Sequence, residues 1–576
     1  MADSPKCYLG IVLHGHLPYV MAHGRWPHGM DWICEAATEC YIPLLRMAEN
    51  LRRSGRHSAL TMGITPVLAE QLRDGDFPAE LDAYCEERVR RAVEAEAYLE
   101  STGDHRVAGM ARWWREYYDG VKRSFHEEYG ADLVGAFARC QELGQMEIIT
   151  CAATHGYLPL LGRDTSVQAQ VRTGVEVYEK HFGRKPRGFW LPECAYRPRY
   201  EWAPPAECGP ARPPVLRKGV DEFLHEAGIR YFIVDTHLLR GGKALGVYRH
   251  RYKALEQLWA QFESQCEPTA ERHTDPNQAY LTSSAPLGMN PVAFFVRDED
   301  TALQVWSGEL GYPGDGWYLD FHKKYFPGGF RFWRVTRAKS DLAEKDLYDW
   351  RQAQQRIPSH ADHFVSLVAS GAAWDGTGAP PIRCCPFDAE LFGHWWHEGP
   401  EWLEAVLERA HDHADVHAVS LGDYLERHEP EKGVGLPEGS WGEGGYHFIW
   451  LNQMTSWTWT RIYEAEDRMA GLLARAPADS AGLLDRVLKQ AARELLLLQS
   501  SDWQFLISTW NARDYAELRF EGHRESFARL ALIAETMLGG AAPTEADVRF
   551  LEETEARDRL FADINLKWFR DLETPV

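Results

Sequence analysis

The sequence lacks any apolar run approaching the roughly 20 residues that a membrane-spanning helix needs. Residues 1–10 also lack the basic segment and apolar stretch of a secretion signal. The 11 cysteines are an odd number and form no CxxC pair, which fits reduced thiols better than a disulfide framework. We therefore expect a cytoplasmic protein with no membrane partner.

Several motifs of cofactor chemistry are missing too. The sequence contains no GxxxxGK[ST] phosphate loop, no HExxH helix, no GxSxG elbow and no convincing GxGxxG turn. Nucleotide-dependent, zincin and serine-hydrolase activities therefore lose support, and we expect catalysis without a cofactor.

Positive charge is scarce relative to negative charge. Asp and Glu number 85 against 63 Lys and Arg, which gives a formal net charge of -22. Such a field repels phosphate backbones, so nucleic acid is not an expected partner. The 22 Trp, 24 Tyr and 24 Phe include flat rings on which a neutral, hydroxyl-rich ligand can stack, although most aromatic residues fill cores.

Short apolar runs predict buried parallel strands, with helical patterns between several of them. They lie at residues 8–13, 147–151, 188–191, 229–235 and 416–421. This alternation favours a barrel-like α/β domain. Polar residues that directly follow such strands are candidates for chemistry, because barrel active sites form at the carboxyl ends of strands.

The chain divides into a predicted catalytic region, 1–432, and a helical region, 433–576, joined by a linker at 430–437. Within the first region, 65–146 reads as a helical insertion. Residues 238–291 read as a long irregular loop, of the kind that often carries function and could serve as a lid.

Glu193 follows a short strand within GFWLPECAYRP, residues 188–198, where aromatic rings and prolines give a carboxylate a rigid mount. The structural alternative is a Glu that caps a helix or pairs with Arg197 or Arg199. Asp388 begins the dense run FDAELFGHWWHEG, residues 387–399, after what reads as an apolar-to-polar turn at 383–387. Its structural alternative is a helix N-cap beside core tryptophans.

Two such carboxylates on separate strands are what cleavage of a glycosidic bond requires. One attacks the anomeric carbon and the other protonates the departing oxygen, about 5 to 5.5 Å apart in a retaining enzyme. His14 and His16 directly follow the first strand, and His155 follows another. An H-x-H pair can bind metal, but no third ligand lies at a recognisable spacing, so we favour hydrogen bonds to sugar hydroxyls and expect no metal. A lone His155 could also be structural.

Five segments in order resemble glycoside hydrolase family 57, and specifically its 1,4-α-glucan branching enzymes. They are LHGHLPY (13–19), TCAATHGYLPLL (150–161), GFWLPECAY (188–196), FDAELFGHWWHEG (387–399) and WGEGGYHFIWLN (441–452), supported by 297–315 and DWQFLI (502–507). The resemblance implies an α/β fold: an incomplete (β/α)7 barrel with a helical insertion and a C-terminal all-helical domain that completes the cleft. It makes Glu193 the nucleophile and Asp388 the general acid/base.

The resemblance also implies a set of substrate contacts. Those expected are His14, His16, Trp32, His155, Arg297, Trp306, His394, Trp395, Trp441, Trp450 and Asp502. The four tryptophans Trp32, Trp306, Trp441 and Trp450 would form aromatic walls. A loop tyrosine matters for transfer in the family, and Tyr248, Tyr252 and Tyr280 remain candidates.

The expected function is retaining 1,4-α-glucan branching by a monomer or small homo-oligomer whose partner is an α-glucan. A 4-α-glucanotransferase or an α-amylase-type hydrolase would use the same carboxylates. A metal-dependent polysaccharide deacetylase, or a silent glycogen-binding protein, is a more distant alternative.

Overall fold

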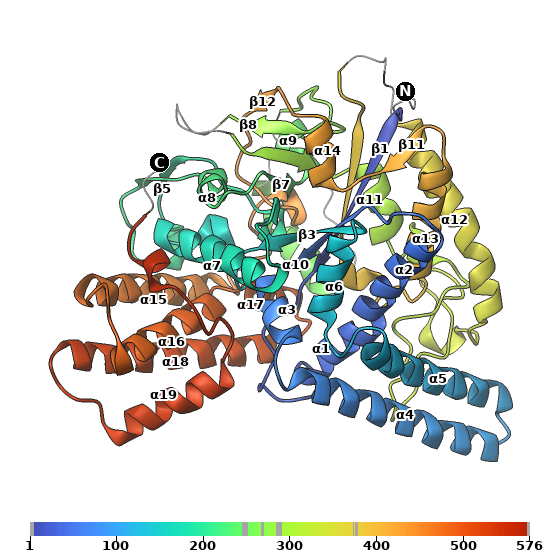
Figure 1. Cartoon of the computed structure of the whole chain (residues 1–576), viewed down its shortest axis with the longest axis horizontal. Coiled ribbons are helices and arrows are strands. Elements are labelled where there is room, and N and C mark those ends of the chain that lie inside the picture. Colours follow the sequence, from blue (N-terminus) through green and yellow to red (C-terminus); the bar gives the residue numbers. More distant parts are fainter. Residues whose placement is uncertain are drawn as a thin grey trace.

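The computed structural model describes residues 5–244, 252–265, 270–283, 291–371, 374 and 378–572. Its centre is a ten-stranded sheet in the order β10-β1-β2-β3-β4-β7-β9-β8-β12, with β11 beside β1 (Figure 1). The predicted α/β class is confirmed. The strands are β1 (Cys7–Gly15), β2 (Leu60–Ile64), β3 (Met146–Cys151), β4 (Gly188–Trp190), β7 (Tyr231–Val234), β8 (Tyr280–Thr282), β9 (Ala293–Val296), β10 (Ile382–Asp388), β11 (Val416–Ala418) and β12 (Gly433–Val434).

The sheet curls on itself. Parallel pairing runs from β10 through β1, β2, β3, β4 and β7 to β9. A parallel bridge from Arg297 to Cys384, with the Asp298 amide donating to the Cys384 carbonyl at 2.8 Å, then brings the end of β9 beside β10. The carboxyl ends of these strands therefore share one rim, where residues that follow different strands meet.

Helices surround this sheet. Between β1 and β2 lie α1 (Met30–Ala36), the π-helical turn η1 (Ala37–Tyr41) and α2 (Ile42–Arg53). Between β2 and β3 lie α3 (Pro66–Leu72), α4 (Phe77–Ser101), α5 (His105–Glu127) and α6 (Leu133–Glu142), of which α4 and α5 form a long pair at the lower right of Figure 1. The later helices of this part are α7 (Asp164–Phe182), α8 (Val220–Glu226), α9 (Thr236–Arg240), α10 (Lys253–Phe262), α11 (Glu299–Trp306), α12 (Trp350–Ser370), α13 (Gly399–Asp412) and α14 (Leu421–Arg427).

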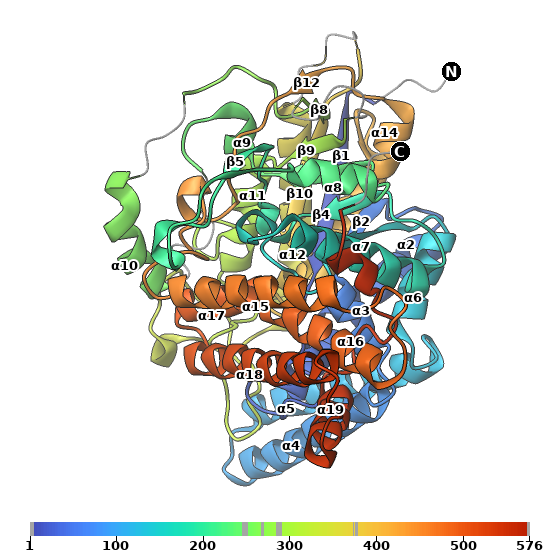
Figure 2. The ribbon, with the colours of Figure 1, turned by 90° about the vertical axis from the view of Figure 1, so that its left-hand side faces the viewer.

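The C-terminal helices gather at the lower left of Figure 1, and Figure 2 shows two long ones, α15 (Ser456–Arg475) and α18 (Arg513–Leu538), running one above the other. They are α15 (Ser456–Arg475), α16 (Gly482–Leu498), α17 (Ser501–Thr509), α18 (Arg513–Leu538) and α19 (Glu545–Arg557). The chain then returns to the sheet region, where the Gln168 side chain on α7 donates to the Trp568 carbonyl at 2.9 Å. In the described ranges no helix has the length and apolarity needed to cross a membrane.

Some sequence predictions of elements were wrong. The presumed turn at 383–387 is strand β10, and Pro386 is tolerated there because β10 has a full strand partner only on its β1 side. The run at 416–421 does contain a parallel strand, but only its first three residues form it: β11 pairs with the start of β1 and lies off the main path of the sheet. Strands β2 and β9 went unpredicted.

Candidate active site

Glu193 sits directly beyond β4, in the 3-10 turn Pro192–Cys194. Its backbone is left-handed, with φ 60° and ψ 24°, and neighbouring Cys194 and the site residue His155 also have positive φ angles of 48° and 59°. Each such residue that is not glycine costs on the order of 1–3 kcal/mol, which surrounding structure must offset. The turn therefore fixes the direction of the Glu193 side chain.

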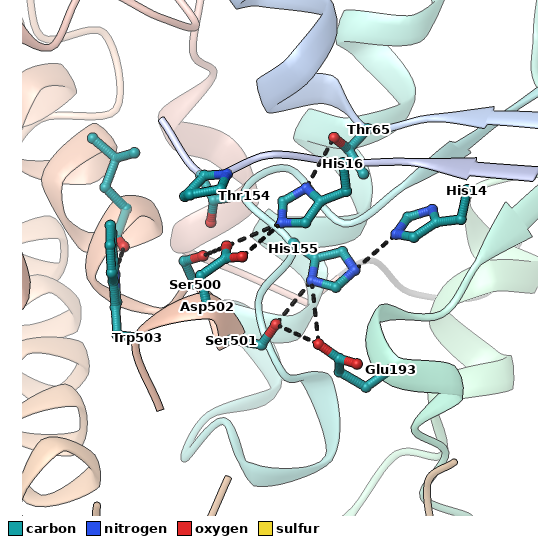
Figure 3. A network of polar contacts seen from close by, with 12 residues as sticks. His14, His16, Thr65, Thr154, His155, Glu193, Ser500, Ser501, Asp502 and Trp503 are labelled. Carbon is teal, nitrogen blue, oxygen red and sulfur yellow. Dashed lines mark hydrogen bonds and ion pairs between the residues drawn. The ribbon is translucent and has the colours of Figure 1, made fainter. Parts of the chain in front are cut away.

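The Glu193 carboxylate is held by donors on both oxygens. The Trp441 indole donates to Oε2 at 2.8 Å and the Ser501 hydroxyl to Oε1 at 3.2 Å, while His155 Nδ1 lies 3.9 Å from Oε1 (Figure 3). Only 8% of the residue is exposed. Burial raises the pKa of Glu193 to about 7, although the Trp441 and Ser501 hydrogen bonds act in the opposite direction. Near neutral pH both charge states are therefore accessible.

Asp388 is the last residue of β10 and is partly buried. Its Cα pairs with that of His14 on β1, so both residues stand at the carboxyl rim of the sheet. Two residues on, Glu390 accepts from the His16 amide at 3.1 Å and from the Tyr41 hydroxyl at 2.5 Å. Asp388 and Glu193 thus occupy the same rim on separate strands.

The three predicted histidines form one network. His14 Nε2 lies 3.0 Å from His155 Nε2, and the His16 and His155 rings stack at 4.0 Å (Figure 3). His16 Nε2 lies 3.0 and 3.1 Å from the two Asp502 oxygens, and its Nδ1 lies 3.1 Å from the Thr65 hydroxyl. Burial lowers the pKa of His16, but the Asp502 charge and hydrogen bond outweigh it and raise that pKa overall. The network therefore joins two strand ends to the N-terminus of α17.

The same side chains include groups that can bind a metal ion. In the described part of the chain, ligand atoms of His16, His155 and Asp502 lie within 4.8 Å of one another. Each already has a protein hydrogen-bond partner, so we assign no metal to them, and the expected absence of a metal stays a prediction. Two similar groups comprise His23, His523 and Asp558, and Glu35, Glu39 and His394.

The four predicted wall tryptophans differ in exposure. Trp32 is partly exposed on α1, whereas Trp306 and Trp441 are 3% and 2% exposed and meet edge to face at 5.8 Å. Trp450 is completely buried and stacks on Tyr157 at 4.7 Å. In this structure Trp441 supports the Glu193 carboxylate, and only Trp32 offers an accessible ring.

Arg297 is also buried, with 1% exposure. It forms a bidentate pair with Asp235, at 2.9 and 2.8 Å, and its guanidinium lies 5.9 Å from the Trp441 ring centre. Arg297 therefore packs against the Trp441 ring. His394 Nδ1 lies 3.2 Å from Glu39, and the partly exposed Trp395 stacks on Phe321 at 4.4 Å.

The candidate loop tyrosines differ in how close they lie to the site. Tyr252 precedes α10 and meets Phe505 of α17 edge-on at 5.9 Å. Tyr280 is buried in β8, and its hydroxyl donates to the Asp275 carbonyl at 2.6 Å. Tyr248 lies outside the described residues. Of the two described tyrosines, Tyr252 is the one next to a helix that enters the site.

Three residues of the site were missed by the sequence analysis: Thr65, Trp190 and Ser501. Trp190 stacks on His14 at 4.3 Å. The signal for Trp190 was present, because it lies within the motif quoted for Glu193. Glu390 belongs to the run at 387–399 that suggested a site, although no role was assigned to it. Ser501 directly precedes DWQFLI, but no local pattern indicates that its helix packs onto the turn that carries His155.

Comparison with known proteins gives consistent matches. A profile described as glycosyl hydrolase family 57 matches residues 10–437, and one described as 1,4-alpha-glucan branching enzyme, C-terminal, matches residues 461–569. A 1,4-alpha-glucan branching enzyme of Thermococcus kodakarensis is 43% identical over 564 residues, which are 97% of this chain and 78% of that protein.

Solved structures align over nearly the whole chain. A GH57-type branching enzyme from the archaeon Pyrococcus horikoshii has a TM-score of 0.85 and 38% identity, covering 99% of this chain and 98% of the other. The alpha-amylase AmyC from Thermotoga maritima has a TM-score of 0.78 and 29% identity, covering 99% of this chain and 100% of the other.

Proposed function

The chain belongs to glycosyl hydrolase family 57, and from that membership and the geometry of its site we propose that it is a 1,4-α-glucan branching enzyme. It acts on α-glucan, cleaving an α-1,4 bond and transferring the released segment to a 6-hydroxyl. The observation that carries the proposal is the buried Glu193 carboxylate, held at the same rim as Asp388 by donors from two distant parts of the chain.

The proposed mechanism is retaining. Asp388 begins protonated and donates its proton to the scissile oxygen, while the ionised Glu193 attacks the anomeric carbon and forms a glycosyl ester. The Trp441 indole holds Oε2 so that the carboxylate does not rotate away from the sugar. Because burial places the Glu193 pKa at about 7, we expect kcat/KM to fall as the pH drops below neutrality.

In the second step Asp388 acts as a base. It removes the proton from the 6-hydroxyl of an acceptor chain, whose oxygen attacks the anomeric carbon and displaces Glu193 with net retention. Water competes for the same intermediate. An acceptor held in the cleft has a high effective molarity, which favours transfer over hydrolysis.

We further propose that the seven strands joined by parallel pairing form an incomplete (β/α)7 barrel, and that residues 433–576 are a helical domain completing the cleft. The bridge between Arg297 and Cys384 supports near-closure of such a barrel. Trp441, Ser501 and Asp502 reach Glu193 or His16 from that helical region. Cytoplasmic location, glycogen as the physiological product and the oligomeric state stay predictions.

An α-amylase-type hydrolase is the second candidate, because AmyC aligns over the full chain. Proton NMR of amylose digests tests the assignment. New α-1,6 signals are expected for branching, whereas rising reducing ends without them would mean hydrolysis, and longer linear chains would mean disproportionation. Binding of glycogen without any product would indicate a silent binding protein. Asp388→Asn is the matched control, since it should abolish all three product signals while leaving glycogen binding measurable.

A further inference from the structure

Ser501 occupies a position between the proposed nucleophile and the histidine network. It is the first residue of α17 and is fully buried. Its hydroxyl oxygen lies 2.8 Å from His155 Nδ1 and 3.2 Å from Glu193 Oε1 (Figure 3). Its backbone amide donates to the His155 carbonyl at 3.1 Å, so the place of the side chain is fixed independently of the hydroxyl.

The direction of these hydrogen bonds follows from His14. Burial lowers the pKa values of His14 and His155 well below the ordinary value, so each ring is neutral and has one N–H donor. His14 Nδ1 is buried and has no hydrogen-bond partner among the described residues. A buried N–H without an acceptor costs more, and is rarer, than a bare acceptor nitrogen. The His14 proton therefore resides on Nε2.

The remaining protons are then determined in sequence. His14 Nε2–H donates to His155 Nε2, which leaves the His155 proton on Nδ1. That N–H donates to the Ser501 oxygen, and the Ser501 hydroxyl has its own proton free to donate to Glu193. With the opposite His14 tautomer, His155 Nδ1 would accept from Ser501 and the hydroxyl could not donate to Glu193.

We propose that Ser501 is a positioning residue for the nucleophile, oriented by a one-way hydrogen-bond chain His14→His155→Ser501→Glu193. The inference rests on the proposed glycosidic chemistry of Glu193. Ser501 fixes Oε1 as Trp441 fixes Oε2, and its donor favours the ionised carboxylate. The same donor stabilises Glu193 when the carboxylate is expelled from the glycosyl ester in the second step.

Removing the hydroxyl has a defined consequence for pH dependence. The largest influences on the Glu193 pKa besides burial are the Trp441 indole, the Asp502 carboxylate, the His16 imidazole and Ser501. The neutral His155 ring also faces Glu193, with Nδ1 3.9 Å from Oε1. Ser501→Ala removes one of the two hydrogen bonds donated to the carboxylate and leaves the other charged groups in the protein. The lost donor raises the Glu193 pKa, so the acid limb of kcat/KM should move to higher pH by about one unit. At its optimum kcat/KM should fall about 10- to 100-fold, as expected for a hydrogen bond to a charged group.

Ser508→Ala is the matched control. Ser508 is a second fully buried serine on α17, and it donates to the Ile449 carbonyl at 2.6 Å, away from Glu193. It should lose stability without moving the acid limb. Ser501→Thr keeps a hydroxyl and should restore the limb. Coincident pH profiles for Ser501→Ala and the wild type would overturn the proposal.

A second measurement reads the tautomers directly. In protein with ¹⁵N-labelled histidine, NMR should place the proton of His14 on Nε2 and that of His155 on Nδ1, with His14→Asn and His155→Asn spectra used for assignment. A His155 proton on Nε2 would overturn the chain whatever the activity. The pH profiles follow total glycosidic cleavage and the tautomers are read without any turnover, so a protein that only hydrolyses would refute branching while leaving the Ser501 result interpretable.

Discussion

The carboxylate of Glu193, the proposed nucleophile, lies in an environment that costs the folded protein stability. It is buried beside tryptophan and serine donors, in a left-handed turn that a glycine would adopt more easily. The sequence could indicate this residue, because a strand followed by a rigid turn is a local pattern. It could not indicate the donors, because Trp441 and Ser501 lie 248 and 308 positions away.

The cost of burying Glu193 can be measured. Its folded pKa of about 7 lies above the unfolded value of 4.5, so the folded state holds the proton more tightly. Stability from this effect is present at low pH and is lost as pH rises through 7, by up to about 3 kcal/mol. Glu193→Gln should therefore match the wild type near pH 5 and exceed its free energy of unfolding at pH 8. Urea unfolding at both pH values checks this.

Glu39→Gln is the opposite case and serves as the control. Burial raises the pKa of Glu39, but the Arg331 guanidinium and His394 lower it further, so its folded pKa lies below the unfolded value. That carboxylate stabilises the fold above about pH 4.5, and its loss should destabilise the protein at pH 8 by about 3 kcal/mol. Equal responses of the two variants to pH would contradict the assigned environments.

At the scale of elements, close packing of α7 on β3 sets the position of the turn that carries His155. A Cβ added to Gly174 on α7 would lie 2.2 Å from the Cys151 carbonyl oxygen, which is backbone and cannot swing aside. The Thr150 hydroxyl also donates to the Gly174 carbonyl at 3.0 Å. The helix therefore lies against the end of the strand where the site begins.

Gly174→Ala should consequently destabilise the protein by about 1–3 kcal/mol and lower turnover, because α7 must move and displace the His155 turn. Gly109→Ala on the exposed face of α5 is the matched control, since its added Cβ would meet nothing within 4 Å. There the substitution should stabilise the fold by about 0.5–1 kcal/mol. Thermal unfolding and branching rates of both variants test the contrast, and a neutral Gly174→Ala would refute the packing argument.

The sequence predicted elements unevenly, for physical reasons. The run at 147–151 corresponds to β3, Met146–Cys151, because every side chain of this parallel strand is buried and most of them are apolar. Strand β10 was read as a turn because Pro386 is a general signal against strands, and only tertiary context shows that its missing N–H is tolerated. Likewise, the apolar face of α17 predicts burial but not that its N-terminus meets His155.

At the scale of the whole molecule, the end of α19 and the segment after it form hydrogen bonds that connect the C-terminal helices to the strand-bearing region. Tyr19, in the loop after β1, donates to the Arg557 carbonyl at 3.2 Å, and the Phe561 amide donates to Glu70 of α3 at 2.9 Å. Such contacts join residues about 500 positions apart, so no local pattern could predict them. They matter for function because the loop after β1 starts from the site residues His14 and His16.

The centre of this junction is Asp558, which is fully buried. His23 Nε2 lies 2.6 Å from Oδ1, and Arg557 donates to Oδ2 at 2.8 Å. Asp558→Asn removes the carboxylate that His23 and Arg557 both contact. Solvent screens the 38% exposed Arg557 side chain, so the cost comes mainly from the buried His23 contact and should be about 1–3 kcal/mol. Since His23 anchors the loop that follows His16, loosening it should also raise KM for amylose.

Asp467→Asn is the control that shows whether burial of a linking carboxylate, rather than the link itself, determines its contribution to stability. Asp467 on α15 also links the C-terminal helices to the rest of the chain, through Arg163 at 2.9 Å and Arg212 at 2.8 Å, but its side chain is 39% exposed. Solvent screens that pair, so its loss should cost no more than about 1 kcal/mol and leave KM unchanged. Urea unfolding midpoints and amylose kinetics of the two variants measure the difference. If both variants lose the same stability, the junction depends on the number of its ion pairs. A large loss confined to Asp558→Asn would mean that the junction depends on the buried Asp558 carboxylate.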